Sequence, residues 1–134
     1  MDYKLIDLPV VPDRRGNLTF IESRQQIPFD IARTYWIYDV PGGQKRYGHA
    51  FYTATELIVA LSGSFDVVLD DGRSRERVHL ARSYKGLLVP RLTWREIDNF
   101  STNSVAMVLS STSYIPEDYI RDYDLFKSTV ATGF

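Results

Sequence analysis

Hydrophobic and polar residues alternate along most of this chain in short runs rich in β-branched and aromatic side chains. Each run is bounded by Gly, Pro, Asp or Ser, a pattern that predicts β-strands separated by turns. Ser62-Gly63 predicts a hairpin tip, and Asp71-Gly72 predicts the next reversal. The predicted strands span residues 3–8, 17–22, 33–38, 55–61, 65–69, 77–80, 86–89, 93–97 and 104–110.

Only the C-terminal segment departs from this pattern. In residues 118–127, Tyr119, Tyr123 and Phe126 recur at helical intervals behind Pro116 and early acidic residues, which predicts a short helix. Many short strands at regular spacing are typical of a sandwich or barrel. The pattern therefore predicts an all-β fold with a short C-terminal helix.

Composition narrows the class of protein. A length of 134 residues fits one domain, residues 1–134, and 44% hydrophobic with 25% charged residues is typical of a soluble globular protein. A formal charge of −1 gives no reason to expect nucleic-acid binding. The absence of cysteine excludes disulfides, a thiolate nucleophile and a zinc–thiolate site. No segment resembles a secretory signal or a membrane span, so we expect a cytoplasmic protein with no membrane partner.

Four residues, Gly43, His49, Glu56 and Gly63, have a spacing that resembles the signature of the cupins, and Gly86, Pro90 and Trp94 follow later. This resemblance implies a cupin-type jelly-roll β-barrel. Phe51 and Arg95 stand where the signature has two further histidines. A divalent ion needs three or four converging ligands and His49 with Glu56 supplies two, so we expect no metal and no other cofactor.

Matching segments along nearly the whole chain carry a closer resemblance: residues 15–22, 27–29, 33–41, 46–50, 60–72 and 118–123. They are similar to the dTDP-sugar 3,4-ketoisomerase family, small cupins related to FdtA and QdtA. The resemblance implies an isomerase that converts a dTDP-linked 4-keto-6-deoxyhexose to its 3-keto isomer. Its expected setting is deoxysugar biosynthesis, for example of lipopolysaccharide O-antigen. The histidine pair of that family falls on His49 and Phe51, and its following lysine on Tyr52.

Moving a ketone from C4 to C3 requires removal of the C3 proton, an enediol, and delivery of a proton to C4. An imidazole suits this abstraction, so His49 is the predicted base. Arg95 is predicted to stabilise the enolate oxygen without an ion, and Tyr52 or Tyr38 to donate a further hydrogen bond. Phe51 is predicted to pack against the sugar or close the pocket. The sequence leaves open whether one base serves both carbons or another residue replaces the second histidine.

A nucleotide diphosphate requires cations, and Arg15, Arg33 and Arg46 lie in the matching segments. The alternative is that such strand arginines face solvent. Tyr35 or Tyr38 is predicted to stack on the base or sugar. Three further residues have competing interpretations: Glu56 lines the site or pairs with an arginine, Trp94 contacts substrate or belongs to the core, and His79 is predicted to be structural or on the surface.

Two other functions remain open, a 3,5-epimerase of the RmlC type and a non-catalytic cupin that binds sugar nucleotides. The apolar N-terminal strand, residues 3–10, would otherwise present an exposed edge. Small cupins of this kind generally pair. We therefore expect a homodimer in which this strand joins the sheet of the partner.

Overall fold

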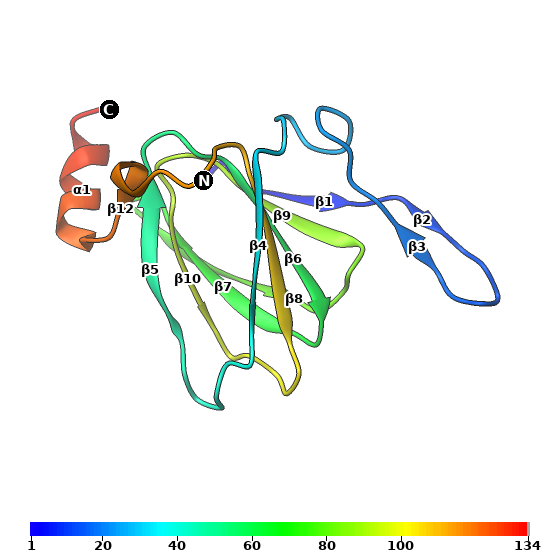
Figure 1. Cartoon of the computed structure of the whole chain (residues 1–134). Helices are drawn as coiled ribbons and strands as arrows, with labels where there is room; N and C mark the ends of the chain where they lie inside the picture. The colour runs from blue at the N-terminus through cyan, green and yellow to red at the C-terminus, as the bar shows by residue number, and fades with distance from the viewer. Residues whose placement is uncertain (134) are drawn as a thin grey trace.

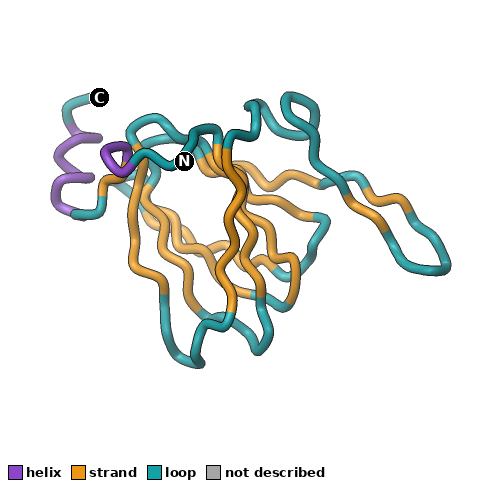
Figure 2. The backbone as a smooth tube through the Cα atoms, in the orientation of Figure 1, coloured by secondary structure: helices purple, strands orange, loops and turns teal. Residues whose placement is uncertain are grey.

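The computed structural model describes residues 1–133, except for the side chain of Tyr47, and its strands are antiparallel (Figures 1 and 2). The strands are β1 (Lys4–Asp7), β2 (Val10–Val11), β3 (Leu18–Thr19), β4 (Arg33–Tyr38), β5 (Arg46–Phe51), β6 (Glu56–Ser62), β7 (Phe65–Asp70), β8 (Arg75–Leu80), β9 (Lys85–Val89), β10 (Trp94–Asp98), β11 (Val105–Ser110) and β12 (Tyr119–Ile120). A 3-10 turn, η1 (Pro116–Asp118), and the helix α1 (Tyr123–Ala131) lie near the C-terminus. Within these residues no helix has the length and apolar character needed to cross a membrane.

Two five-stranded sheets contain most of the strands. Their orders are β1-β9-β6-β11-β4 and β12-β5-β10-β7-β8, and β2 and β3 form a separate hairpin. This arrangement confirms the predicted all-β jelly roll with a short C-terminal helix. The two sheets face each other and are not hydrogen-bonded into one closed barrel.

Period-two alternation builds the core between the sheets, because alternate side chains of a strand point to the same face. Phe65, Val67 and Leu69 of β7 are fully buried and belong to the main core cluster. Strand β6 is buried along most of its length, since Leu57 and Val59 also contact a second apolar cluster. That cluster contains residues of the N-terminal segment, which therefore covers the outer face of this sheet.

One of the two predicted turns has a different role from the one expected. Asp71-Gly72 joins the paired strands β7 and β8, and Gly72 has a φ of +94°, as predicted for a hairpin turn. Ser62-Gly63 also reverses the chain, with a φ of +64° at Gly63, but β6 and β7 belong to different sheets. The predicted hairpin tip is wrong, because a sequence turn signal does not say which strands pair across it.

The N-terminal strand pairs within its own chain. Strand β1 lies at one edge of its sheet, with Leu5 opposite Leu87 of β9. The chain then continues into the β2–β3 hairpin, which projects beyond the two sheets (Figure 1). The apolar segment that extends away from the sheets is therefore this hairpin and not β1.

The C-terminal helix begins later than predicted. Helix α1 starts at Tyr123, where the carboxylate of Asp122 accepts a hydrogen bond from the Asp124 N–H at 3.0 Å. The residues before it form η1 and then β12, which pairs with β5 so that Tyr119 lies opposite Phe51. The spacing of aromatic residues was misleading here, because Tyr119 and Tyr123 lie in different elements.

A buried carboxylate fixes this segment to the end of β5. Asp118 accepts hydrogen bonds from the backbone N–H groups of Thr53 and Ala54 at 2.9 and 3.1 Å. These contacts hold β12 beside the strand that carries His49.

Candidate active site

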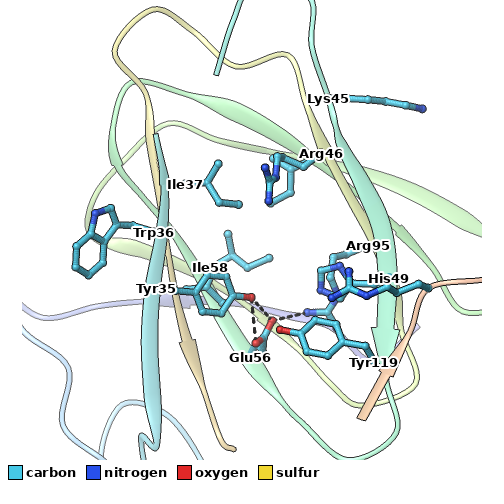
Figure 3. Close-up of a pocket in the computed structure, with 13 residues that line it drawn as sticks. Tyr35, Trp36, Ile37, Lys45, Arg46, His49, Glu56, Ile58, Arg95 and Tyr119 are labelled. Atoms are coloured by element: carbon cyan, nitrogen blue, oxygen red, sulfur yellow. Dashed lines mark hydrogen bonds and ion pairs between the residues drawn. The ribbon is translucent and has the colours of Figure 1, made fainter. Parts of the chain in front are cut away.

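A cavity of about 600 Å³ lies between the inner faces of the sheets (Figure 3). Ile58, Ile97 and Val108 belong both to its wall and to the main core. Its polar lining comes from β4, the loop before β5, β5, β6, β10 and the segment that follows η1: Tyr35, Lys45, Arg46, His49, Glu56, Arg95, Tyr119 and Arg121. Cations outnumber anions in this lining, which suits an anionic ligand.

Strand pairing brings His49 and Arg95 together. They are direct Cα partners in β5 and β10, and the next aligned pair is Arg46 with Ile97. Between these pairs, two residues of β5 lie opposite one residue of β10, which is the geometry of a β-bulge. The extra residue lets Arg46 and His49, which are an odd number of positions apart, both reach the cavity.

Glu56 is the centre of a buried polar network. Its carboxylate accepts hydrogen bonds from the Tyr35 hydroxyl at 2.9 Å and from Arg95 Nη1 at 3.0 Å (Figure 3). Arg33 Nη2 lies 3.5 Å from the other carboxylate oxygen. The side chains of Glu56 and Arg95 are 1% and 3% exposed, so this ion pair is shielded from water. Burial and the charge of Glu56 raise the pKa of Tyr35 far above its usual range.

His49 is a largely buried, uncharged imidazole. Burial, followed by the positive charges of Arg95, Arg121, Arg33 and Arg46, lowers its pKa to about 3. Its ring packs edge-on against Phe51 at a centroid distance of 5.0 Å. Within the described residues Nε2 has no hydrogen-bond partner. A neutral imidazole with an unpaired buried nitrogen can accept a proton from a molecule in the cavity.

The residues present do not fit the metal of a typical cupin. His49 and Glu56 are the two ligand types that the signature retains, and the Glu56 carboxylate already binds two guanidinium groups. Within residues 1–133 no group of three or more His, Cys, Asp or Glu side chains has a ligand arrangement. A divalent ion at this carboxylate would meet the charges of Arg33 and Arg95.

The structure brings most of the predicted site together. His49, Arg95, Tyr35, Arg46 and Glu56 line the cavity. Arg33 adjoins it through Glu56 and the hydroxyl of Tyr119, to which it donates a 3.3 Å hydrogen bond. Phe51 is buried, and the Arg95 guanidinium lies 5.0 Å from its ring centroid, so it supports the site from behind the lining.

Besides Arg33 and Phe51, four predicted site residues lie outside the cavity lining. Tyr52 and Trp94 pack with Ala50 and Phe126 beneath α1, since strand alternation directs them away from His49 and Arg95. Of the two interpretations of Trp94, the structure therefore supports the one that places it in the core. Tyr38 is 60% exposed at the end of β4. Arg15 lies in the β2–β3 hairpin and binds Asp13 at 2.7 Å.

Three residues of the polar lining were not predicted: Lys45, Tyr119 and Arg121. Tyr119 and Arg121 fall in the segment predicted to be helical. Their strand-like alternation, on either side of the buried Ile120, was therefore not recognised. His79, by contrast, lies on the surface as predicted, with Nδ1 2.6 Å from Asp66.

Comparisons with known proteins agree with this geometry. Residues 1–131 match the family model described as "FdtA: WxcM-like, C-terminal". A TDP-4-oxo-6-deoxy-alpha-D-glucose-3,4-oxoisomerase of Aneurinibacillus thermoaerophilus is 40% identical over 98% of this chain and 94% of its own. The chain belongs to the FdtA family.

Solved structures of similar proteins have the same fold throughout. A 3,4-ketoisomerase from Helicobacter canadensis has a TM-score of 0.95 and 38% identity, covering 98% of both chains. A histidine-to-asparagine mutant of the ketoisomerase QdtA from Thermoanaerobacterium thermosaccharolyticum, in complex with TDP-4-keto-6-deoxyglucose, has a TM-score of 0.96 and 32% identity, covering 99% of this chain and 96% of that one. A dTDP-4-dehydrorhamnose 3,5-epimerase from Bacillus anthracis shares the fold with a TM-score of 0.77, at 19% identity over 88% of this chain and 77% of that one.

Proposed function

We propose that this chain is a TDP-sugar 3,4-ketoisomerase that converts a TDP-linked 4-keto-6-deoxyhexose to its 3-keto isomer without a metal. The observation that carries the proposal is the unpaired, neutral imidazole of His49 in a cation-rich cavity, in a chain 40% identical to a 3,4-oxoisomerase. The 3,5-epimerase alternative has only a shared fold in its favour. A nucleotide-sugar substrate is consistent with the cytoplasmic location expected from the sequence.

In the proposed mechanism His49 Nε2 takes the proton from C3. The electron pair moves toward the C4 carbonyl, and an oxyanion develops on O4. Arg95 lies beside His49 on the paired strand, and its Nε has no partner within the described residues, so it can donate a hydrogen bond to this oxyanion. Arg46, Lys45 and Arg121 are placed to hold the diphosphate, since they line the same cavity.

The test is to incubate the protein with TDP-4-keto-6-deoxyglucose in D2O and follow the sugar by NMR. We expect the 3-keto isomer, and a loss of at least about 100-fold in His49→Asn. His79→Asn is the matched control, because it removes the other histidine of the chain, which lies on the surface. Deuterium at C5 would identify an epimerase, and saturable TDP binding without turnover a non-catalytic protein; either result rejects the proposal.

We propose further that the protein is a homodimer in which the β2–β3 hairpin packs on the partner. A two-stranded hairpin is marginally stable alone, and this one exposes the apolar residues Val10, Val11 and Leu18. The outer face of β6 and β11 carries an apolar groove of about 640 Å³, lined in part by Val59 and Met107, which a hairpin of a second copy would complement.

Arg15 lies in this hairpin, so its predicted role in substrate binding depends on a partner chain. Light scattering at micromolar concentration should give the dimer mass. Val11→Asp with Leu18→Asp should give the monomer, whereas a monomeric native protein rejects the proposal.

A further inference from the structure

Among the described side chains, two phenols line the cavity, those of Tyr35 and Tyr119, and their hydroxyl groups have different hydrogen-bond partners. The Tyr35 hydroxyl donates to the carboxylate of Glu56, with its oxygen 2.9 and 3.1 Å from the two carboxylate oxygens. The same carboxylate and burial raise the pKa of Tyr35. Its proton is therefore committed to Glu56, and Tyr35 is a poor acid for a reaction in the cavity.

Tyr119 has the opposite arrangement. Its oxygen accepts a hydrogen bond from Arg33 Nη1 at 3.3 Å, which is its only hydrogen bond within the described part of the chain. Its own proton is thus available to a ligand. The Arg121 guanidinium lies 4.3 Å from the ring centroid. Two cations therefore contact this phenol, Arg33 at the oxygen and Arg121 at the ring.

Tyr119 also lies directly beside the proposed base. The ring centroids of Tyr119 and His49 are 5.3 Å apart, and both side chains line the cavity (Figure 3). The pairing of β12 with β5 places Tyr119 opposite Phe51, at a centroid distance of 4.6 Å. A second proton-carrying group is therefore present beside the position at which the sequence lacks a second histidine.

We propose that Tyr119 is the second proton-transfer residue, which delivers a proton to C4 of the sugar and recovers one from the C3 hydroxyl. This inference rests on the ketoisomerase function proposed above. His49 takes the C3 proton, the C3–H electron pair forms the C3=C4 bond, and the carbonyl pair moves to O4. O4 then receives the proton held by His49, which gives the enediol.

The second half of the reaction uses Tyr119. The C3=C4 electron pair takes the phenol proton at C4, the O3–H pair forms the C3 carbonyl, and the O3 proton returns to the phenolate. The sugar loses hydrogens from C3 and O3 and gains them at C4 and O4. His49 and Tyr119 both end in their starting protonation states, so the cycle needs no oxidant or reductant.

The test uses Tyr119→Phe, which keeps the ring that packs on His49 and Phe51 but removes the hydroxyl. With TDP-4-keto-6-deoxyglucose in D2O, NMR should show that the variant still exchanges the C3 hydrogen of the substrate. Formation of the 3-keto isomer should fall by at least about 100-fold. His49→Asn should lose both the exchange and the product. Tyr84→Phe, which alters a half-exposed phenol in the β8–β9 loop, is the control and should behave like the native protein.

TDP affinity, measured by calorimetry, should be unchanged in Tyr119→Phe, which separates proton transfer from a structural role. Full product formation by this variant overturns the proposal, and so does parallel loss of exchange and product with TDP affinity intact. A native protein that forms no 3-keto isomer overturns the proposed function, and this inference with it. If the native protein is active and only Tyr119→Phe departs from the expected behaviour, then only the role of Tyr119 is rejected.

Discussion

Removing the charge of Glu56 should destabilise the protein more than removing the charge of its main partner, Arg95. The network holds two guanidinium groups, from Arg33 and Arg95, and one carboxylate, so it carries one net positive charge. Glu56→Gln leaves both cations without their anion in a buried site. Arg95→Met leaves Glu56 with Arg33 and with the hydrogen bond from Tyr35.

The magnitudes follow from this asymmetry. Removing one partner of a buried ion pair costs about 3–5 kcal/mol, and the 1% and 3% exposed fractions of Glu56 and Arg95 place this pair in that class. Arg95→Met leaves the ion pair of Glu56 with Arg33, whose charges cancel. We expect a cost of about 1–3 kcal/mol, set by the hydrogen bonds that the variant loses. Glu56→Gln should therefore be the less stable variant by about 2 kcal/mol.

Urea denaturation at a fixed protomer concentration, followed by tryptophan fluorescence, measures both changes. The slope of unfolding free energy against urea should stay constant, so that the midpoints report stability. Equal destabilisation by the two variants, or a larger loss in Arg95→Met, would refute the view that Glu56 holds two buried cations in place.

Four other predictions follow from the site and its surroundings. Since the pKa of His49 is about 3, kcat/KM should not fall as the pH is lowered through 6.5, and a midpoint near 6.5 would contradict the buried, cation-rich environment. The same shift lowers the free energy of unfolding as pH falls from 6.5 toward 3, because the unfolded chain binds a proton that the folded chain does not; His49→Asn should flatten this dependence in urea titrations. Gly48→Ala should cost about 1–3 kcal/mol in thermal or urea unfolding, since its Cβ would overlap the indole ring of Trp94, whereas Gly42→Ala, with nothing within 4 Å, should be close to neutral. Asp118→Asn should cost about 1–3 kcal/mol in the same assay because it weakens the bonds to the backbone after β5, and an unchanged midpoint would contradict that role.

The sequence predicted the strands that have clear alternation, such as β4 and β11, because one face of each is buried. It did not predict β5 as a strand, although this strand carries His49. Its segment, Arg46–Phe51, contains a glycine and the polar cavity residues Arg46 and His49, so its pattern is not that of a strand packed in an apolar core. Strands that line a polar cavity lack the hydrophobic alternation from which strands are predicted.

A similar limit explains which residues of the site could be predicted from the sequence. Motif spacing identified His49, Glu56 and Arg95, since these positions are fixed by register in the sheets. Tyr119 and Arg121 reach the cavity only because the C-terminal segment returns to pair with β5, far away in sequence. Tyr52, at the position of the family's lysine, was predicted to donate a hydrogen bond, but it follows the end of β5 and packs with Trp94 and Phe126.

The excess of cations in the cavity has a consequence for catalysis as well as for binding. In the free protein, burial and then the charges of Arg95, Arg121, Arg33 and Arg46 lower the pKa of His49, which makes it a weak base. A bound diphosphate adds negative charge among these guanidinium groups and so raises that pKa back toward its usual range. The imidazole therefore becomes a stronger base when the nucleotide is in place. The acid limb of kcat, which reports the complex, should lie at a higher pH than that of kcat/KM, which reports the free protein. Binding energy from the phosphates would thereby contribute to the chemical step at C3, because Arg46 and Arg121, two of the residues proposed to hold the diphosphate, also lower the pKa of His49 in the free protein.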